Sequence, residues 1–214
     1  MANTLLIESQ YLPPIASIAR MVHHQDVLLE QHEYYIKSSY RNRSHIGTAN
    51  GMLRLSVPLV RGRRERQSIK NIKISYPDNK WVYLHWRGIC YAYRSSPYFE
   101  YYEDEFAPFF EKKFTYLWDY NEQLLQTILG CLGANVNIGY TDSFQKKYND
   151  TAFTDYRSAI LPKLEHCRQD DLFTHPKYTQ VFEDKIGFIP NLSILDLLFA
   201  EGPRSLDILQ KSIQ

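Results

Sequence analysis

A short basic segment, residues 37–43, holds the side chains best suited to binding an anion. Its sequence is Lys-Ser-Ser-Tyr-Arg-Asn-Arg, and guanidinium forks, hydroxyl groups and an amide are the donors that hold a phosphate or a carboxylate. The wider stretch 37–70 contains nine Lys or Arg and one acid, a charge of about +8, on a chain whose formal net charge is +1. We therefore expect a local anion site formed by Lys37, Tyr40, Arg41, Asn42 and Arg43.

Opposite charge elsewhere in the chain leaves a second interpretation of this segment open. Residues 100–122 contain seven acids and two lysines, a charge of about −5. The two patches could pair with each other or lie on solvated faces, since exposed ion pairs are common and contribute little. A second basic run, Arg61 to Arg66, contains a glycine and lies between two predicted strands, which favours a solvated hairpin tip.

Two of the seven histidines stand where a general base is conceivable. His85 lies one helical turn after Trp81 and next to Trp86, so it is either a core histidine or a base whose pKa lies near neutral pH. His175 lies close to Tyr178 in a stretch without periodicity, and loops often carry catalytic groups. The candidate catalytic residues are therefore His85, His175 and Tyr178.

Several common kinds of site have no support in the sequence. It lacks the G-x-G-x-x-G, G-x-x-x-x-G-K-[ST], G-x-S-x-G and H-E-x-x-H motifs, so no cofactor is expected. The three cysteines are far apart, which argues against a disulfide framework or a metal site and favours a reducing cytoplasm. No stretch approaches the ~18 apolar residues of a membrane span, the first residues do not resemble a signal peptide, and the near-neutral charge argues against a nucleic-acid partner.

The start of the chain predicts a β-α-β unit that would position part of the site. Residues 5–7 and 27–29 are short apolar runs, and between them two prolines precede apolar residues spaced as on one helix face. Two strands joined by a helix usually lie parallel in one sheet, and α/β proteins bind ligands at the carboxyl ends of such strands. Gln10 and Tyr11 follow the first strand, so we expect them and residues 31–43 at that edge, where they would bind substrate.

The remaining pattern predicts an α/β protein: the amino-terminal β-α-β unit lies in a mixed sheet, and the carboxyl-terminal half is mainly helical. Alternating apolar residues predict strands at 53–59, after the Asn50-Gly51 turn, and at 72–74. Helical spacing predicts a helix at 79–94. The capping pair Asp119 and Glu122 predicts a helix at 119–133 that Gly133 ends, and the pair Ser193 and Asp196 predicts a last helix at 194–199. Residues 140–175 are expected as loop with a possible short helix near 154–160. The length favours a single domain over residues 1–214.

Six short motifs occur in order along the chain: Gln10 to Pro13, Lys37 with Tyr40 to Arg43, Leu55 to Pro58, His85 to Arg87, His175 to Gln180, and Asn191 to Pro203. Each is common alone, but their order over residues 5–203 resembles the WbqC-like proteins. That family is associated with bacterial surface-polysaccharide and O-antigen gene clusters, and a role as a glycine or aminoacyl transferase on a sugar has been proposed for it. The resemblance implies the same class of activity here.

The resemblance and the basic segment together suggest a cytoplasmic transferase that acts on a nucleotide- or lipid-diphosphate-linked sugar and transfers an aminoacyl group such as glycine. Lys37, Arg41 and Arg43 would hold the diphosphate, and a histidine would be the general base. The main alternative is a non-catalytic binding or scaffold protein of the polysaccharide assembly machinery, which predicts Tyr, Trp and Arg on an exposed surface. A nucleotidyl-transfer enzyme is a third option. The oligomeric state is left open.

Overall fold

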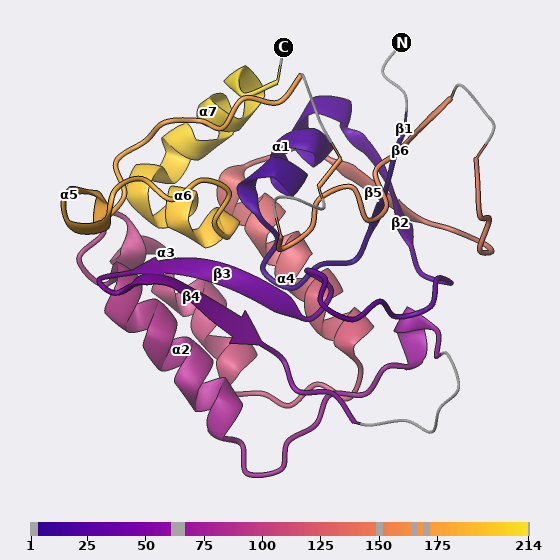
Figure 1. The fold of residues 1–214 in the computed structure, drawn as a ribbon, viewed down its shortest axis with the longest axis horizontal. Coiled ribbons are helices and arrows are strands. Elements are labelled where there is room, and N and C mark those ends of the chain that lie inside the picture. The colour runs from indigo at the N-terminus through magenta and orange to yellow at the C-terminus, as the bar shows by residue number, and fades with distance from the viewer. Residues whose placement is uncertain (1–3, 61–66, 149–151, 164–166, 169–171, 214) are drawn as a thin grey trace.

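The computed structural model describes residues 4–60, 67–148, 152–163, 167–168 and 172–213. The basic run Arg61 to Arg66 lies outside these ranges, so its hairpin-tip interpretation stays a prediction. Figure 1 shows a parallel sheet on one side of the molecule, helices on the other, and a separate two-stranded hairpin across the front.

The parallel sheet has four strands in the order β5-β2-β1-β6. These strands are β1 (Thr4–Glu8), β2 (Asp26–Glu30), β5 (Asn137–Tyr140) and β6 (Phe153–Asp155). Leu5, Leu6 and Ile7 are all fully buried, as expected for a central parallel strand that is covered on both faces. The pairing of Glu8 with Glu30 places two carboxylates together at the carboxyl edge of the sheet.

Helix α1 (Ile15–His24) connects β1 and β2, which confirms the predicted β-α-β unit. Its first turn has no side-chain cap from its own N-cap residue, Pro14. The Ile15 amide instead donates to the Leu192 carbonyl, and the Ala16 amide donates to the Asn191 side chain. A distant segment of the chain therefore satisfies the amide groups that a helix leaves open at its start.

A β-hairpin of β3 (Arg43–Thr48) and β4 (Gly51–Ser56) forms the second sheet. Gly51 has a φ of +100°, a conformation that favours glycine, so the predicted Asn50-Gly51 turn is confirmed. The first strand of this hairpin has no clear alternation and was not expected. Residues 72–74 form only isolated bridges, to Leu59 and Tyr116, rather than a strand in a sheet.

Helices dominate the second half of the described chain, which confirms the predicted α/β class. They are α2 (Lys80–Tyr93), α3 (Phe99–Phe106), α4 (Leu117–Leu132), α5 (Glu183–Ile186), α6 (Ile194–Glu201) and α7 (Ser205–Lys211), with the 3-10 turns η1 (Ile69–Asn71), η2 (Ala107–Phe110) and η4 (Gly202–Arg204). Phe199 of α6 packs against Tyr93, Phe99 and Phe106, so α2, α3 and α6 share one aromatic core.

Two local predictions were wrong. The helix expected near 154–160 is instead strand β6 followed by a turn, because these residues extend the parallel sheet beside β1. Asp119 does not cap α4: that helix begins two residues earlier, and Asp119 lies in its first turn. The end of α4 at Gly133, in the left-handed conformation, and the cap of α6 by the Ser193 hydroxyl are both confirmed.

Gly202, which ends α6, is expected to be the least replaceable of the described glycines. A Cβ built on it would lie 2.5 Å from Cδ1 and 2.6 Å from Cγ of Tyr98, and its φ is +54°. Gly133 has a similar φ of +63° but an open environment. Gly133→Ala should therefore lose about 1 kcal/mol of unfolding free energy, and Gly202→Ala should lose clearly more in urea denaturation. Equal losses would mean that the Tyr98 ring yields freely.

Candidate functional site

Three glutamates lie buried where the central parallel strands end. Glu8 is the last residue of β1, Glu30 is the last residue of β2, and Glu33 follows three residues later; all three side chains are almost fully removed from solvent. Carboxylates are rarely buried without partners, because the loss of hydration costs several kcal/mol per ion. The groups that neutralise these three carboxylates therefore determine the charge at this edge of the sheet.

Arg41 is the first of these partners, and none of its side chain is exposed. Its Nε and Nη2 atoms donate to the two carboxylate oxygens of Glu33, at 2.6 and 2.7 Å, which is the bidentate geometry that favours an Arg–carboxylate pair. Its Nη1 atom lies 4.0 Å from Oε1 of Glu8. One guanidinium group thus connects the end of β1 to the loop that follows β2.

Arg157, which follows β6, is the second partner. Its Nη1 atom donates to Oε2 of Glu30 at 3.1 Å, and its Nη2 atom donates to Oδ2 of Asp155 at 2.6 Å. The guanidinium group also lies over the rings of Phe144 and Tyr148, 5.5 and 5.3 Å from their centroids. Asp155 is partly exposed and Phe144 is exposed, so the pair of Arg157 and Asp155 lies at the boundary with solvent.

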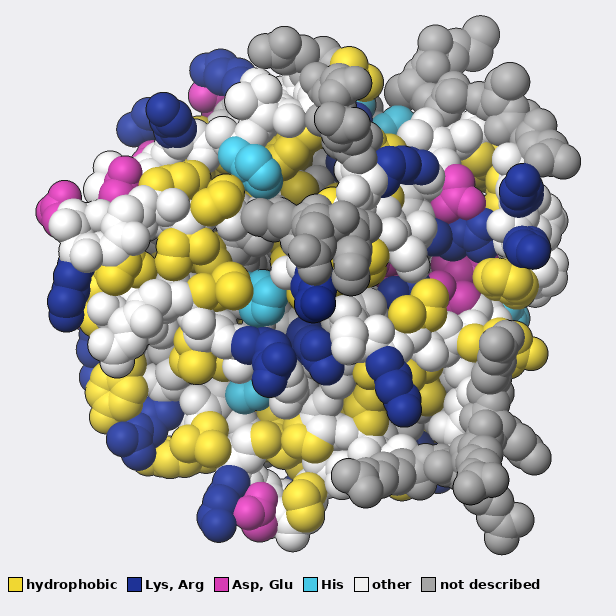
Figure 2. Space-filling model, viewed as in Figure 1, with side chains coloured by type: hydrophobic (Ala, Val, Ile, Leu, Met, Phe, Trp, Pro, Cys, Tyr) yellow, Lys and Arg dark blue, Asp and Glu magenta, His cyan; other side chains and the backbone are white. Residues whose placement is uncertain are grey.

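These six residues form what we call the charged network: Glu8, Glu30, Glu33, Asp155, Arg41 and Arg157. Its four carboxylates outnumber its two guanidinium groups. Burial raises the pKa of Glu33 above its ordinary value, although the Arg41 hydrogen bond and charge act in the opposite direction. Figure 2 shows acidic and basic side chains side by side on the surface over the parallel sheet.

Amide side chains surround the charged network and leave some polar atoms without a partner. Gln10 donates to Glu8, and the Asn121 amide nitrogen donates to Ser9 and to the Arg41 carbonyl. In the described part of the chain, the amide oxygens of Gln10 and Asn121 and the Nη1 atom of Arg41 make no hydrogen bond. Two acceptors and one donor therefore remain unsatisfied beside the buried carboxylates.

The basic segment divides between this network and the hairpin. Tyr40 is buried, and its carbonyl accepts from the Tyr11 amide. Asn42 bonds the Val57 carbonyl and accepts from the Tyr35 hydroxyl. Arg43 is half-buried at the start of β3, whereas Lys37 is exposed. Arg41 is committed to carboxylates, so its guanidinium group is not the open phosphate ligand that was expected, and the three cations do not form a clamp around one cavity in the described residues.

The structure joins Tyr11 to His85 inside the core. The Ser56 amide donates to Nε2 of His85 at 3.1 Å, so this nitrogen is an acceptor, and a neutral ring then carries its proton on Nδ1. That proton faces the Tyr11 hydroxyl at 2.9 Å. Burial lowers the pKa of His85 to about 4. With both nitrogens bonded, His85 has the contacts of a core histidine, the first of the two interpretations that its sequence position allowed.

The other two candidate catalytic residues have separate surroundings. His175 is exposed and packs edge-on against Phe173, and partial burial lowers its pKa. Tyr178 is buried, and its hydroxyl donates to Oδ2 of Asp196 at 2.9 Å. No bond between His175 and Tyr178 is present in the described structure, so their closeness in sequence does not create a dyad.

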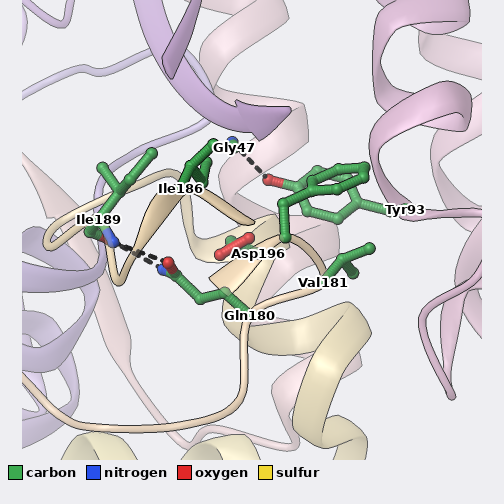
Figure 3. Close-up of a pocket in the computed structure, with 8 residues that line it drawn as sticks. Gly47, Tyr93, Gln180, Val181, Ile186, Ile189 and Asp196 are labelled. Carbon is green, nitrogen blue, oxygen red and sulfur yellow. Dashed lines mark hydrogen bonds between the residues drawn. The ribbon is translucent and has the colours of Figure 1, made fainter. Parts of the chain in front are cut away.

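Asp196 forms a second buried polar site, which Figure 3 shows. It lies in the first turn of α6 beside a small cavity of about 10 Å³, whose walls include Gly47, Tyr93 and Gln180. That volume suits a single water molecule. Burial raises the pKa of Asp196 to about 6, although the hydroxyls of Tyr178 and Tyr93 act to lower it. The sequence had shown Asp196 only as a helix-start residue.

The sequence interpretation missed most of the charged network. Glu8 and Glu30 each end an apolar run, which was a usable signal, because parallel strands bring such residues together. Asn121 and Arg157 gave no such signal: one lies inside a helix and the other in a stretch without periodicity. In the described residues, no cluster of His, Cys, Asp and Glu could hold a metal ion. None of the described helices combines the length and hydropathy that a membrane span requires.

Arg41→Ala should strongly destabilise the protein. The substitution leaves Glu33 and Glu8 buried without their cation, a loss that typically costs about 3–5 kcal/mol. Arg43→Ala is the matched control, because Arg43 is half-buried and its removal should cost about 1 kcal/mol or less. Urea denaturation of both variants measures the difference. Two similarly small losses would contradict the structural role given to Arg41.

Asp196 should make stability depend on pH. Its folded-state pKa of about 6 lies above the ordinary value of 3.8, so its contribution to stability is complete below pH 3.8 and is lost as the pH rises through 6. Asp196→Asn removes this dependence. Between pH 4 and pH 7, the unfolding free energy of the variant should therefore gain up to about 3 kcal/mol relative to the wild type. Exposed Asp184→Asn should show no such gain, and a flat difference for Asp196→Asn would refute the assignment.

Comparison with known proteins agrees with the sequence resemblance. The model of the WbqC-like protein family matches residues 8–168. The chain is 26% identical over 229 residues to "Uncharacterized protein Rv1507c" of Mycobacterium tuberculosis (strain ATCC 25618 / H37Rv), and the match covers 98% of each chain. No solved structure matches significantly. The matched range contains the charged network from Glu8 to Arg157, and the chain belongs to the WbqC-like protein family.

Proposed function

We propose that the protein is a transferase that acts on a nucleotide- or lipid-diphosphate-linked sugar in surface-polysaccharide biosynthesis, with the carboxyl edge of the parallel sheet as its site. The observation that carries this proposal is the charged network, where four carboxylates and two arginines meet at the ends of β1, β2 and β6. Ligands of parallel α/β proteins bind outside the carboxyl ends of the strands. Membership of the WbqC-like family supports the polysaccharide context.

The surplus of carboxylates suits the acceptor side of an aminoacyl transfer. A carboxylate accepts hydrogen bonds from sugar hydroxyls or from an amino group, and one with a raised pKa, such as Glu33, is suited to remove a proton from the attacking group. The nucleophile would then form a bond to the acyl carbon, the bond between that carbon and the donor's leaving group would break, and Glu33 would pass the proton it had taken to the leaving group. The proposal assigns the general base to Glu33, whose oxygens each keep a second lone pair beside the Arg41 bond, rather than to His85, whose one lone pair accepts from the Ser56 amide.

The diphosphate would bind at the solvent side of the same edge. Phe144 and Tyr148 lie there beside Arg157 and offer aromatic surfaces against which a sugar ring can pack, while Arg157 itself is committed to Glu30 and Asp155. Lys37 is exposed and Arg43 is half-buried, and both stay in the proposal as phosphate ligands. Gln10 and Asn42 would contribute as supports of Glu8 and of the hairpin.

A thermal-shift measurement against a panel of nucleotide sugars tests the proposal. A ligand at a hundredfold its dissociation constant should stabilise the protein by about 2.7 kcal/mol. Arg43→Ala, which should leave the fold intact, should weaken that binding at least tenfold, whereas Arg204→Ala, which removes an exposed arginine of η4, should bind as the wild type does. If no phosphate-bearing compound shifts the transition, the transferase proposal fails.

A second candidate function is a non-catalytic binding protein of the polysaccharide assembly machinery. A specific observation favours it: Tyr83, Arg87 and Tyr91 lie exposed together on α2. Tyr and Arg are the residues that dominate protein interfaces. In this case the charged network would hold the fold, and the α2 surface would carry the function.

A further inference from the structure

On the exposed face of α2, one arginine lies between two tyrosine rings. The transferase proposal gives these side chains no role. The Arg87 guanidinium group lies 5.5 Å from the Tyr83 ring centroid and 5.2 Å from the Tyr91 ring centroid. Tyr83 is 58% exposed and Tyr91 is 72% exposed. In Figure 2 hydrophobic and basic side chains alternate along the lower left of the molecule, over α2.

A groove of about 510 Å³ runs along this face. Its lining residues are Tyr83, Trp86, Arg87, Cys90, Tyr91, Arg94 and Ser95. All of them belong to α2 or to the two residues after it, so one helix forms the whole groove. A small-molecule site normally encloses most of its ligand. A surface with only one wall is better suited to a protein partner that supplies the other.

Charge on the neighbouring helix identifies the kind of partner. Helix α2 and its C-cap residue carry Lys80, Arg87 and Arg94 and no acid, whereas α3 carries Glu100, Glu103, Asp104 and Glu105 and no Lys or Arg. Nη2 of Arg94 lies 3.6 Å from Oε1 of Glu103, so the two helices present their opposite charges side by side. Glu100 and Asp104 are exposed next to Glu103. The combined surface is thus basic on one half and acidic on the other.

We propose that this surface binds a second copy of the same chain, with α2 of each copy against α3 of its partner. In a two-fold interface the same patch is used by both copies, so a patch with adjacent basic and acidic halves is complementary to itself. Tyr83, Leu84, Tyr91 and Tyr101 are the large exposed apolar side chains of the two helices. Together they offer on the order of 600 Å², close to the ~800 Å² per partner of a standard interface. The proposal does not depend on the transferase activity.

Sedimentation velocity of the full-length protein tests the dimer. One chain has a mass of 25.3 kDa, so the wild type should sediment as a species of twice that mass at micromolar concentration. Two variants reverse one half of the surface each. The all-acidic variant carries Arg87→Glu and Arg94→Glu, and the all-basic variant carries Glu100→Lys, Asp104→Lys and Glu105→Lys. Each alone should raise the dissociation constant at least tenfold, because like charges then face each other.

Mixing the two variants gives the sharpest result. The acidic α2 of one variant meets the basic α3 of the other, and the acidic α3 meets the basic α2, so the equimolar mixture should recover the dimer. Circular dichroism and thermal melting should show that both variants stay folded, since all five substituted residues are exposed. Lys211→Glu on α7 is the control for a general charge effect and should leave the dimer intact.

The other outcomes contradict the proposal. A wild type that stays monomeric at 100 µM would exclude a second copy as the occupant. A dimer that survives in both variants would place the interface elsewhere. If the all-acidic variant loses binding to a nucleotide sugar while the wild type is a monomer, the groove is a small-anion site instead.

Discussion

The neutralisation of three buried glutamates at the end of the parallel sheet is the interaction on which the rest of the structure depends. Glu8 and Glu30 are adjacent because their strands are in parallel register, so their charges must be balanced at that point. Arg41 and Arg157 reach this position from two separate loops. The hydrogen bonds of these two arginines therefore stabilise the sheet. They also fix the positions of the loops that follow β2 and β6.

The same network defines what this edge of the sheet can bind. Two nitrogens of Arg41 donate to Glu33 and the third faces Glu8, so Arg41 organises the glutamates rather than meeting an anion. The remaining carboxylate surplus attracts donors such as hydroxyl and amino groups. Arg157 is likewise committed to Glu30 and Asp155, and the Phe144 and Tyr148 rings beside it lie at the boundary with solvent. The inner part of this edge is therefore buried and rich in carboxylates, and its outer part is aromatic and faces solvent.

Local pattern was sufficient to predict some of the elements, but not the strands β3 and β6 and not the tertiary partners of the side chains. The β-α-β unit, α2, α4 and α6 follow from apolar spacing, which one segment carries by itself. Arg41 could be recognised as important from its neighbours in sequence, yet its real partners, Glu8 and Glu33, are determined by strand register and loop closure. The start of α4 was misplaced because Asp119 has the residue type of a cap, while packing of Leu117 and Trp118 in the core extends the helix by two residues. His85 shows the same limit, since its bonds to Tyr11 and Ser56 are tertiary contacts.

The first turn of α1 also has a consequence for how the protein forms in the cell. Its open amide groups are satisfied by residues 191 and 192, and its buried side packs against α6 and α7. The nascent β-α-β unit therefore leaves the ribosome without the segment that completes it. Until about 170 further residues have been synthesised, its apolar helix face must be shielded by transient contacts or by a chaperone, so α1 reaches its final packing only after α6 and α7 have been made.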